Sequence, residues 1–378
     1  MEPFKNLMSE DVVRLLAFHL DKSLGGFDAE LFNASVVPQL EPLELKERVQ
    51  MIADHMLNVL PANAVDRNTI LVGMLHPDKL TSASKDSDSD GMCGWGVWPL
   101  TDVIGRTGLE AYDHSMEALR EITMRGTSEF DVRPFIASDP DRALRIMRAW
   151  AHDENEHVRR LATEGSRPRL PWGIRLHALV EDPTKTLPIL ETLRDDPSEY
   201  VRRSVANHLN DIAKDHPDLV ADVATEWMKN ASKDREKLIR HACRSLIKQG
   251  HSRTLAVFGV LPPQITAPVV NIKTPIVMMG ETLEFQITCL SQAKQPQKLV
   301  IDYVIHHRKA NGTLAPKVFK WKQVTLQPGE ELGATRSHPI RPITTRKYYA
   351  GAHAVSLRIN GQDFGNEPFE LRIWQMKP

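Results

Sequence analysis

The fold of this chain is decided by an octet that occurs twice, as D-E-N-E-H-V-R-R (residues 153–160) and D-P-S-E-Y-V-R-R (residues 196–203). Its Asp, Glu, Val and two Arg positions recur after 43 residues, a spacing typical of HEAT-type pairs of helices. A weaker third copy follows 37 residues later, in which Leu238, Arg240, Ala242 and Leu246 match Val201, Arg203, Val205 and Leu209. Such repeats bury their apolar faces only by stacking, so we predict a helical solenoid.

Local helix signals agree with this repeat. Three Asp-Pro pairs favour an N-cap followed by proline at the first helical position, at Asp139-Pro140, Asp182-Pro183 and Asp196-Pro197. The spacing of Asp153 with Glu156, and of Asp196 with Glu199, predicts two capping boxes. Apolar periodicity predicts further helices over residues 11–24 and 43–60. We therefore expect a mainly α protein, in which residues 1–260 form a HEAT-like-repeat domain.

The pattern changes after Val260. The stretch L-P-P-Q-I-T-A-P (residues 261–268) is typical of a linker, and apolar residues then alternate with a period of two. The alternating runs cover residues 283–289, 299–305, 355–359 and 369–373. Turn signals separate several of them, at Asn311-Gly312, Pro328-Gly329 and Asn360-Gly361. We predict that residues 265–378 form an immunoglobulin-like β-sandwich without the disulfide.

Composition limits the compartment and the partners. No apolar run approaches the ~20 residues of a membrane helix, and the N-terminal stretch lacks the regions of a signal peptide. Cys93, Cys243 and Cys289 are far apart and are expected to be buried and reduced, as in the cytoplasm. Residues 251–378 carry 16 Lys and Arg against 8 Asp and Glu, although the whole chain has a net charge of −1. This basic third favours a polyanion partner, but a solvated basic surface would give the same count.

The helix predicted over residues 199–214 carries a polar column beside its apolar stripe. Arg203, Asn207 and Asp211 lie at i, i+4 and i+8 on one face. The column of the preceding repeat holds Arg160 and Glu164. Stacked repeats would align these columns, so we expect a basic strip that contacts phosphates and contains two carboxylates. The residues expected to contact the phosphates are Arg160, Arg167, Arg169, Arg175, Arg203, Arg240, Arg244 and Lys248.

The connection A-T-E-G-S-R-P-R-L-P-W-G-I-R (residues 162–175) is the best candidate for chemistry, because it sets Glu164 and Trp172 among arginines. The structural interpretation of Glu164 is an ion pair with Arg160, four residues earlier. Asp211 could likewise pair with Arg203 or lie in solvent. Trp172 could belong to the core. Two further tryptophans, Trp95 and Trp98, could bind a ligand but are expected to cover the end of the helical array.

The functional interpretation is that these carboxylates face a developing positive charge. Cleaving a base from deoxyribose produces an oxocarbenium-like sugar, which carboxylates stabilise. A base made cationic by alkylation leaves without a general acid, so an ionised carboxylate and an aromatic face would be enough. Glu129, in S-E-F-D-V-R-P-F (residues 128–135), is a third acidic candidate.

These stretches, together with S-V-A-N-H-L-N-D-I-A-K (residues 204–214), resemble the AlkC branch of HEAT-like-repeat DNA glycosylases. The resemblance covers about residues 1–260, and the basic Ig-like extension is similar to that of one subset of the branch. It implies a monofunctional glycosylase that removes small cationic lesions, chiefly N3-methyladenine, from double-stranded DNA in base excision repair. Members of this architecture bend DNA and reach the lesion without flipping it fully into a pocket.

The resemblance also implies residue roles. Asp211 would stabilise the sugar cation and position water, Glu129 and Glu164 would hold the cationic base, and Trp172 would pack against the lesion or its sugar. The basic Ig-like domain would grip the duplex beside the solenoid. No metal, organic cofactor or obligate protein partner is implied, and the expected location is the cytoplasm, at the nucleoid. Two alternatives stay open: a non-catalytic repeat scaffold, and a protein that binds distorted DNA without cutting it.

Overall fold

The two copies of the octet lead into two helices that pack against each other, α9 (Glu156–Glu164) and α12 (Glu199–Ile212). The computed structural model describes residues 3–79, 86–344 and 346–373. The chain divides into two compact units, Met1–His216 with Asn230–Ala242, and Pro217–Lys229 with Cys243–Pro378. The first unit is helical, and the second combines helices with the β-strands. The predicted domain boundary at residues 260–265 stays a prediction.

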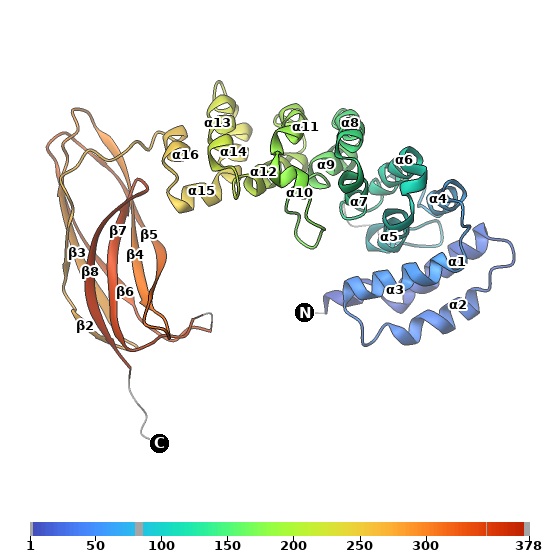
Figure 1. Ribbon diagram of the computed structural model, residues 1–378, viewed down its shortest axis with the longest axis horizontal. Helices are drawn as coiled ribbons and strands as arrows, with labels where there is room; N and C mark the ends of the chain where they lie inside the picture. Colours follow the sequence, from blue (N-terminus) through green and yellow to red (C-terminus); the bar gives the residue numbers. More distant parts are fainter. Residues whose placement is uncertain (1–2, 80–85, 345, 374–378) are drawn as a thin grey trace, which may run out of the picture. The chain divides into compact units, whose positions relative to one another are not determined.

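The helices of the first unit follow one another in space in chain order (Figure 1). They are α1 (Glu10–Ser23), α2 (Ala29–Val36), α3 (Leu45–Leu57), α4 (Ala64–Gly73), α5 (Trp98–Thr107), α6 (Tyr112–Thr123), α7 (Arg133–Ser138), α8 (Pro140–Trp150), α9, α10 (His177–Glu181), α11 (Leu187–Leu193), α12 and α14 (Lys233–Ala242). Short 3₁₀ helices lie before or between them, at η1 (Phe4–Leu7), η2 (Val37–Gln39), η3 (Gly94–Val97), η4 (Leu109–Ala111) and η5 (Pro183–Thr186). No helix among the described residues is both long and apolar enough to cross a membrane.

The first arginine of each octet joins one repeat to the next. The Arg159 side chain donates to the Asp196 carboxylate at 2.6 Å, and Arg202 pairs with Asp234 at 3.2 Å. One repeat earlier, Arg120 donates in the same way to Asp153 at 2.9 Å. These ion pairs are the physical reason for the recurring Asp and Arg of the octet.

The same pairs explain why the capping predictions were wrong in part. Asp139 caps α8 as predicted, with its side chain accepting from the Arg142 amide. Asp153 and Asp196 do not occupy the cap positions, because the caps of α9 and α12 are Asn155 and Ser198. Asp153 and Asp196 lie two residues before those caps, where each accepts from the cap residue's amide and from an arginine of the preceding repeat.

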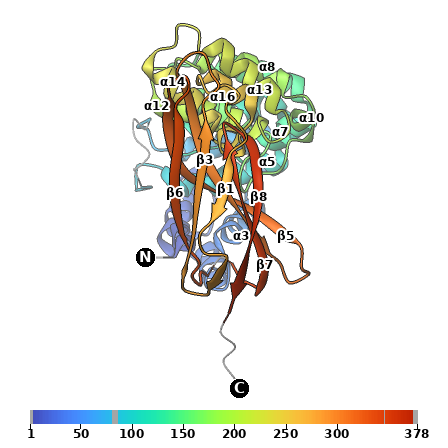
Figure 2. The same ribbon diagram turned by 90° about the vertical axis from the view of Figure 1, so that its left-hand side faces the viewer.

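The second unit contains two β-sheets around one hydrophobic cluster. Its elements are α13 (Pro217–Trp227), α15 (Arg244–Gln249), α16 (Ser252–Val257), β1 (Val269–Ile272), β2 (Ile276–Met278), β3 (Thr282–Leu290), β4 (Gln297–Arg308), β5 (Leu314–Leu326), β6 (Glu331–Pro339), β7 (Gly351–Ile359) and β8 (Gln362–Arg372). The three-stranded sheet has the order β1-β3-β6, as Figure 2 shows, and the five-stranded sheet has the order β2-β8-β7-β4-β5. All pairs are antiparallel except β2 with β8.

The predicted alternation is confirmed in the core of the sheets. Leu283, Phe285 and Ile287 of β3 are fully buried, and so are Leu299, Ile301 and Ile305 of β4. The three cysteines are free and buried, as expected.

The Asn360-Gly361 turn joins β7 to β8 and also contacts the helices of its own unit. Both residues have positive φ, 48° and 82°, which is typical of a two-residue hairpin turn. The Asn360 side-chain amide donates to the Leu261 carbonyl at 2.7 Å. A Cβ at Gly361 would lie 2.0 Å from the Gly250 carbonyl oxygen, just after α15. Only glycine fits this close approach of two backbones.

Buried histidines in both units carry lowered pKa values. Burial lowers the pKa of His307 in β4 to about 3 and that of His338 in β6 to about 4. Burial likewise lowers the pKa of His208 in α12 to about 4. These imidazoles are therefore neutral in the folded protein at physiological pH.

Lowering the pH from 7 to 5 is expected to lower the urea concentration at which the protein unfolds. Histidines of the unfolded chain titrate near pH 6.5, whereas the buried ones stay neutral, so below pH 6.5 the unfolded state binds more protons. The buried histidines therefore do not affect the free energy of unfolding above pH 6.5. Below it, this free energy falls as the pH drops toward 4. Circular dichroism during urea unfolding at several pH values measures this. His307→Gln, which cannot be protonated, should weaken the dependence, and an equal fall in the variant would contradict the assignment.

Candidate functional site

The loop between α9 and α10 is fixed by one buried arginine that the sequence interpretation missed. Arg133, at the start of α7, is fully buried. Its guanidinium donates to the carbonyls of Gly165 and Arg167, both at 2.8 Å, and of Ile174 at 2.8 and 2.5 Å. Burial lowers its pKa to about 10, so it stays charged at neutral pH. Arg133 thus ties both ends of the loop to one point.

Trp172 lies at the tip of this loop and is presented to solvent. Its φ is 66°, in the left-handed region, and it is 57% exposed. The core interpretation of Trp172 is therefore wrong. Lys46 of α3 donates to the Trp172 carbonyl at 2.9 Å, and the Phe4 ring contacts the indole edge-on with centroids 6.1 Å apart. The left-handed backbone costs about 1–2 kcal/mol in a residue other than glycine. These contacts hold it in place.

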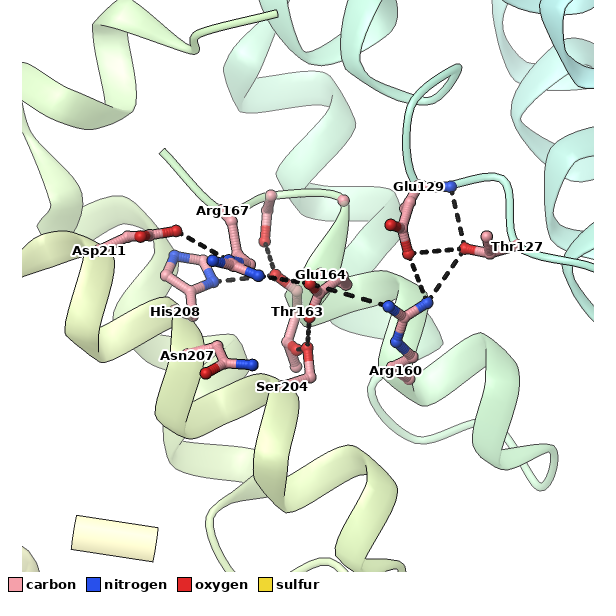
Figure 3. Close-up of polar contacts among 12 residues, drawn as sticks. Thr127, Glu129, Arg160, Thr163, Glu164, Arg167, Ser204, Asn207, His208 and Asp211 are labelled. Atoms are coloured by element: carbon pink, nitrogen blue, oxygen red, sulfur yellow. Dashed lines mark hydrogen bonds and ion pairs between the residues drawn. The ribbon is translucent and has the colours of Figure 1, made fainter. Parts of the chain in front are cut away.

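Glu164 and Asp211 are brought together through Arg167, as Figure 3 shows. The Arg167 Nε donates to Asp211 Oδ2 at 2.8 Å, and its NH1 donates to Glu164 Oε1 at 2.5 Å. Lys214 contacts Asp211 Oδ1 at 2.8 Å, and Ser204 donates to Glu164 Oε2 at 2.5 Å. Both carboxylates are buried. Asp211 therefore pairs with Arg167 and Lys214, so both structural interpretations of this residue, a pair with Arg203 and a place in solvent, are wrong.

Glu129 joins the same network through Arg160. Arg160 NH1 lies 2.6 Å from Glu129 Oε2, and its NH2 lies 3.8 Å from Glu164 Oε1. The Arg160 guanidinium also lies over the Tyr200 ring, 5.0 Å from its centroid. Burial raises the pKa of Glu164, but the charges of Arg160 and Arg167 outweigh burial and hold that pKa below its ordinary value. The three acids predicted from sequence thus form one continuous chain of ion pairs.

An aromatic pocket of about 450 Å³ opens beside this network. Glu129, Arg160 and Trp172 are among its lining residues, whereas Glu164 and Asp211 are not. The other aromatic lining residues are Phe4, Trp95, Trp98, Phe130, His157 and Tyr200. Trp98 stacks on Phe130 with centroids 5.2 Å apart, and Trp95 lies against Trp98 at 5.8 Å. The expectation that Trp95 and Trp98 only cover the end of the array is therefore incomplete.

Several of the predicted basic residues are engaged in ion pairs in the free protein. Arg160 and Arg167 are engaged by the acids. Arg169 pairs with Asp215 at 2.7 Å, and exposed Arg203 pairs with Glu199 at 3.2 Å. Arg175 and Arg240 are exposed in the first unit, and Arg244 and Lys248 are exposed in the second.

One group of side chains in the described part of the chain has the spacing of metal ligands. Atoms of His76, Asp88 and Asp90 lie within 4.8 Å of one another. Asp88 Oδ1 also accepts from the amides of Asp90 and Gly91, which accounts for its position as a turn-forming residue. None of the three belongs to the network of acids.

Two family models match the chain. A model of DNA alkylation repair enzymes matches residues 126–246, and a model of the C-terminal Ig-like domain of the uncharacterised protein YhaZ matches residues 266–373. The uncharacterized protein YhaZ of Bacillus subtilis (strain 168) is 37% identical over 364 residues, 96% of this chain and 97% of that protein. A solved structure of Pseudomonas fluorescens alkylpurine DNA glycosylase AlkC, bound to DNA containing an abasic site analogue, is 35% identical with a TM-score of 0.77. That match covers 98% of this chain and 99% of the other.

The helical repeats and these matches define a class, the helical-repeat proteins of DNA alkylation repair. Within it, the chain belongs to the AlkC-type family of HEAT-like-repeat DNA alkylation-repair glycosylases that carry a C-terminal Ig-like domain. The resemblance seen in the sequence is confirmed.

Proposed function

We propose that this protein is a monofunctional DNA glycosylase that hydrolyses the N-glycosidic bond of small cationic alkylated bases, chiefly N3-methyladenine, in double-stranded DNA. One observation carries the proposal. Three carboxylates, Glu129, Glu164 and Asp211, form a single ion-pair network beside a pocket with aromatic walls. Carboxylates and aromatic faces are the groups that favour a cationic base and a sugar cation. The related AlkC was solved bound to DNA containing an abasic site analogue, which supports DNA as the partner.

The roles follow from where charge develops. When the bond from C1′ to the base nitrogen breaks, its electron pair moves into the ring and neutralises the cationic base, so no general acid is needed. Asp211 stabilises the positive charge left on the sugar and positions the water whose oxygen bonds to C1′; the released proton passes to solvent. Glu129 and Trp172, which line the pocket, hold the base together with Glu164. The remaining basic residues and the Ig-like domain contact the phosphates.

We also propose an architecture for the two parts of the chain. The repeats of residues 1–260 form a HEAT-type solenoid, and residues 265–378 form an Ig-like sandwich. The packing of α9 against α12 and of α12 against α14 supports a repeat array, and the hydrophobic cluster shared by the two sheets supports a sandwich. No cofactor or protein partner is required for this hydrolysis.

Incubation with DNA methylated by a methylating agent, followed by chromatography of the released bases, tests the activity. Free N3-methyladenine is expected in the soluble fraction. Intact DNA binding without base release would favour a protein that only recognises distorted DNA. Loss of both would favour the scaffold alternative.

Replacing Trp95 with alanine is expected to slow the release of N3-methyladenine about 2- to 30-fold, the worth of one cation–aromatic contact. Trp95 is 41% exposed and lines the pocket between Phe4 and Trp98. Single-turnover kinetics with methylated DNA measures the effect. Phe18→Ala is the matched control, since Phe18 is also 41% exposed and does not line the pocket. An equal effect of both changes would show that the wall of the pocket does not hold the base.

A further inference from the structure

The carboxylates to which catalysis is assigned are already neutralised in the free protein. Arg167 and Lys214 occupy the two oxygens of Asp211 at 2.8 Å each. Arg167 also occupies one oxygen of Glu164, and the Ser204 hydroxyl occupies the other. The Asp211 and Glu164 side chains are 4% and 7% exposed. A carboxylate whose two oxygens are both engaged and whose side chain is buried is screened from a sugar cation.

The charges of the ion-paired groups in the network add up to zero, and the charged Arg133 nearby binds backbone carbonyls. Glu129, Glu164 and Asp211 supply three negative charges, and Arg160, Arg167 and Lys214 supply three positive ones. If one arginine leaves, the network lacks one positive charge. A base methylated at a ring nitrogen carries one positive charge, and the sugar that it leaves behind carries one as well. The single positive charge of the base, or of the sugar after the bond breaks, would therefore replace the charge of the departed arginine.

Arg167 is the arginine placed to leave. Arg160 is held by Glu129, by Thr127 at 3.1 Å and by the Tyr200 ring. In the described structure, the contacts of the Arg167 guanidinium are with the two carboxylates that it covers. Its backbone is fixed, because its carbonyl accepts from Arg133, so the side chain can move while the loop stays in place. DNA phosphates accept a guanidinium bidentately and compete well for it.

Resting on the proposed function, we propose that Arg167 is a displaceable counter-ion: its guanidinium leaves Glu164 and Asp211 for a DNA phosphate, and so uncovers the two carboxylates when a duplex is bound. Arg167 is then a positioning residue that couples DNA engagement to the charge of the site. It explains why a residue predicted to contact DNA is buried among acids.

The test measures binding to an undamaged duplex and to a duplex with an abasic-site analogue, neither of which requires base release. Arg167→Gln is expected to reduce the slope of log affinity against log salt by about 0.9, one phosphate contact. Arg167→Lys should keep the slope, and so should Arg142→Gln, which breaks an exposed pair with Asp113. For methylated DNA, Arg167→Gln should raise the concentration at half-maximal rate more than it lowers the saturating rate. An unchanged salt slope would show that Arg167 stays on the carboxylates and would overturn the proposal.

A second arm keeps Arg167 itself in place, in case Arg167→Gln does not fold by circular dichroism. Asp211→Asn removes the charge that holds Arg167, so DNA affinity at low salt should rise at least about 3-fold. Asp195→Asn, in an exposed pair with Arg235, controls for net charge. A gain no larger than that of Asp195→Asn overturns the proposal. If base release fails in the wild type while these binding effects appear, the proposed activity is wrong and the counter-ion exchange stands.

Discussion

Replacing Asp211 with asparagine is expected to lower the single-turnover rate of N3-methyladenine release by about 10²- to 10³-fold, the scale of losing one preorganised electrostatic group. Asparagine keeps the size and one acceptor oxygen of the side chain but removes the charge to which the proposed function assigns the sugar cation. DNA binding should be kept or strengthened, so the loss should appear in the saturating rate. Rapid mixing with excess enzyme and chromatography of the free base measure it.

Asp215→Asn is the matched control, because Asp215 lies one turn after Asp211 and pairs with Arg169 on the exposed surface. This variant should keep its rate within about 3-fold, since surface pairs contribute little. A wild-type rate for Asp211→Asn would rule out the assigned role, and catalysis would then depend on Glu129 or Glu164. Circular dichroism of each variant separates a loss of chemistry from a loss of fold.

Replacing Arg133 with methionine is expected to destabilise the protein by about 2–5 kcal/mol and to lower base release at least about 10-fold in the molecules that remain folded. The carbonyls of Gly165, Arg167 and Ile174 would lose their buried donor. Methionine also removes a buried charge, and this relieves the desolvation penalty of that charge. The expected loss of stability is therefore smaller than the sum of the lost hydrogen bonds. The loop that presents Trp172 would then no longer be fixed at both ends.

Arg67→Met provides the comparison that isolates the loop. Arg67 is also buried and donates to three carbonyls, those of Pro61, Ala62 and Thr107. Its loss should lower the melting temperature comparably and leave base release per folded molecule within about 3-fold. If both variants slowed base release equally, general loosening of the helices would explain the effect, and the special role of Arg133 would be lost.

The repeat could be predicted from sequence because each octet carries its own contact to the next repeat. Val201, Val205 and Leu209 gave the apolar stripe of α12, and all three are buried. The cap positions could not be found in the same way. Asp153 and Asp196 are engaged by Arg120 and Arg159 from the preceding repeat, and local spacing does not report such long-range pairing.

Those residues of the candidate site that lie on periodic helices could be predicted from the sequence. The polar columns brought Glu164 and Asp211 into one region, and the structure joins them through a single guanidinium. That guanidinium belongs to Arg167, in a loop without periodicity, so its position between the acids had no sequence signal. The aromatic lining of the pocket could not be predicted from the sequence for a similar reason. Trp98 and Phe130 are 32 positions apart in the chain, and only the packing of α5 against the turn before α7 stacks them.

The hairpin at Asn360-Gly361 has a consequence for the modular evolution and engineering of the β-sheets. Its turn presses against the backbone of Gly250, and Arg358 of the preceding strand donates to the Gln249 carbonyl at 3.2 Å. The segment of α15 and α16 therefore packs against this hairpin of the five-stranded sheet. A fragment that carries the β-sheets into another protein would have to begin before α15. A fragment that began in the proline-rich stretch (residues 261–268) would lack the helices that the hairpin contacts. Recombination between relatives should favour junctions within the helical array over junctions at the proline-rich stretch.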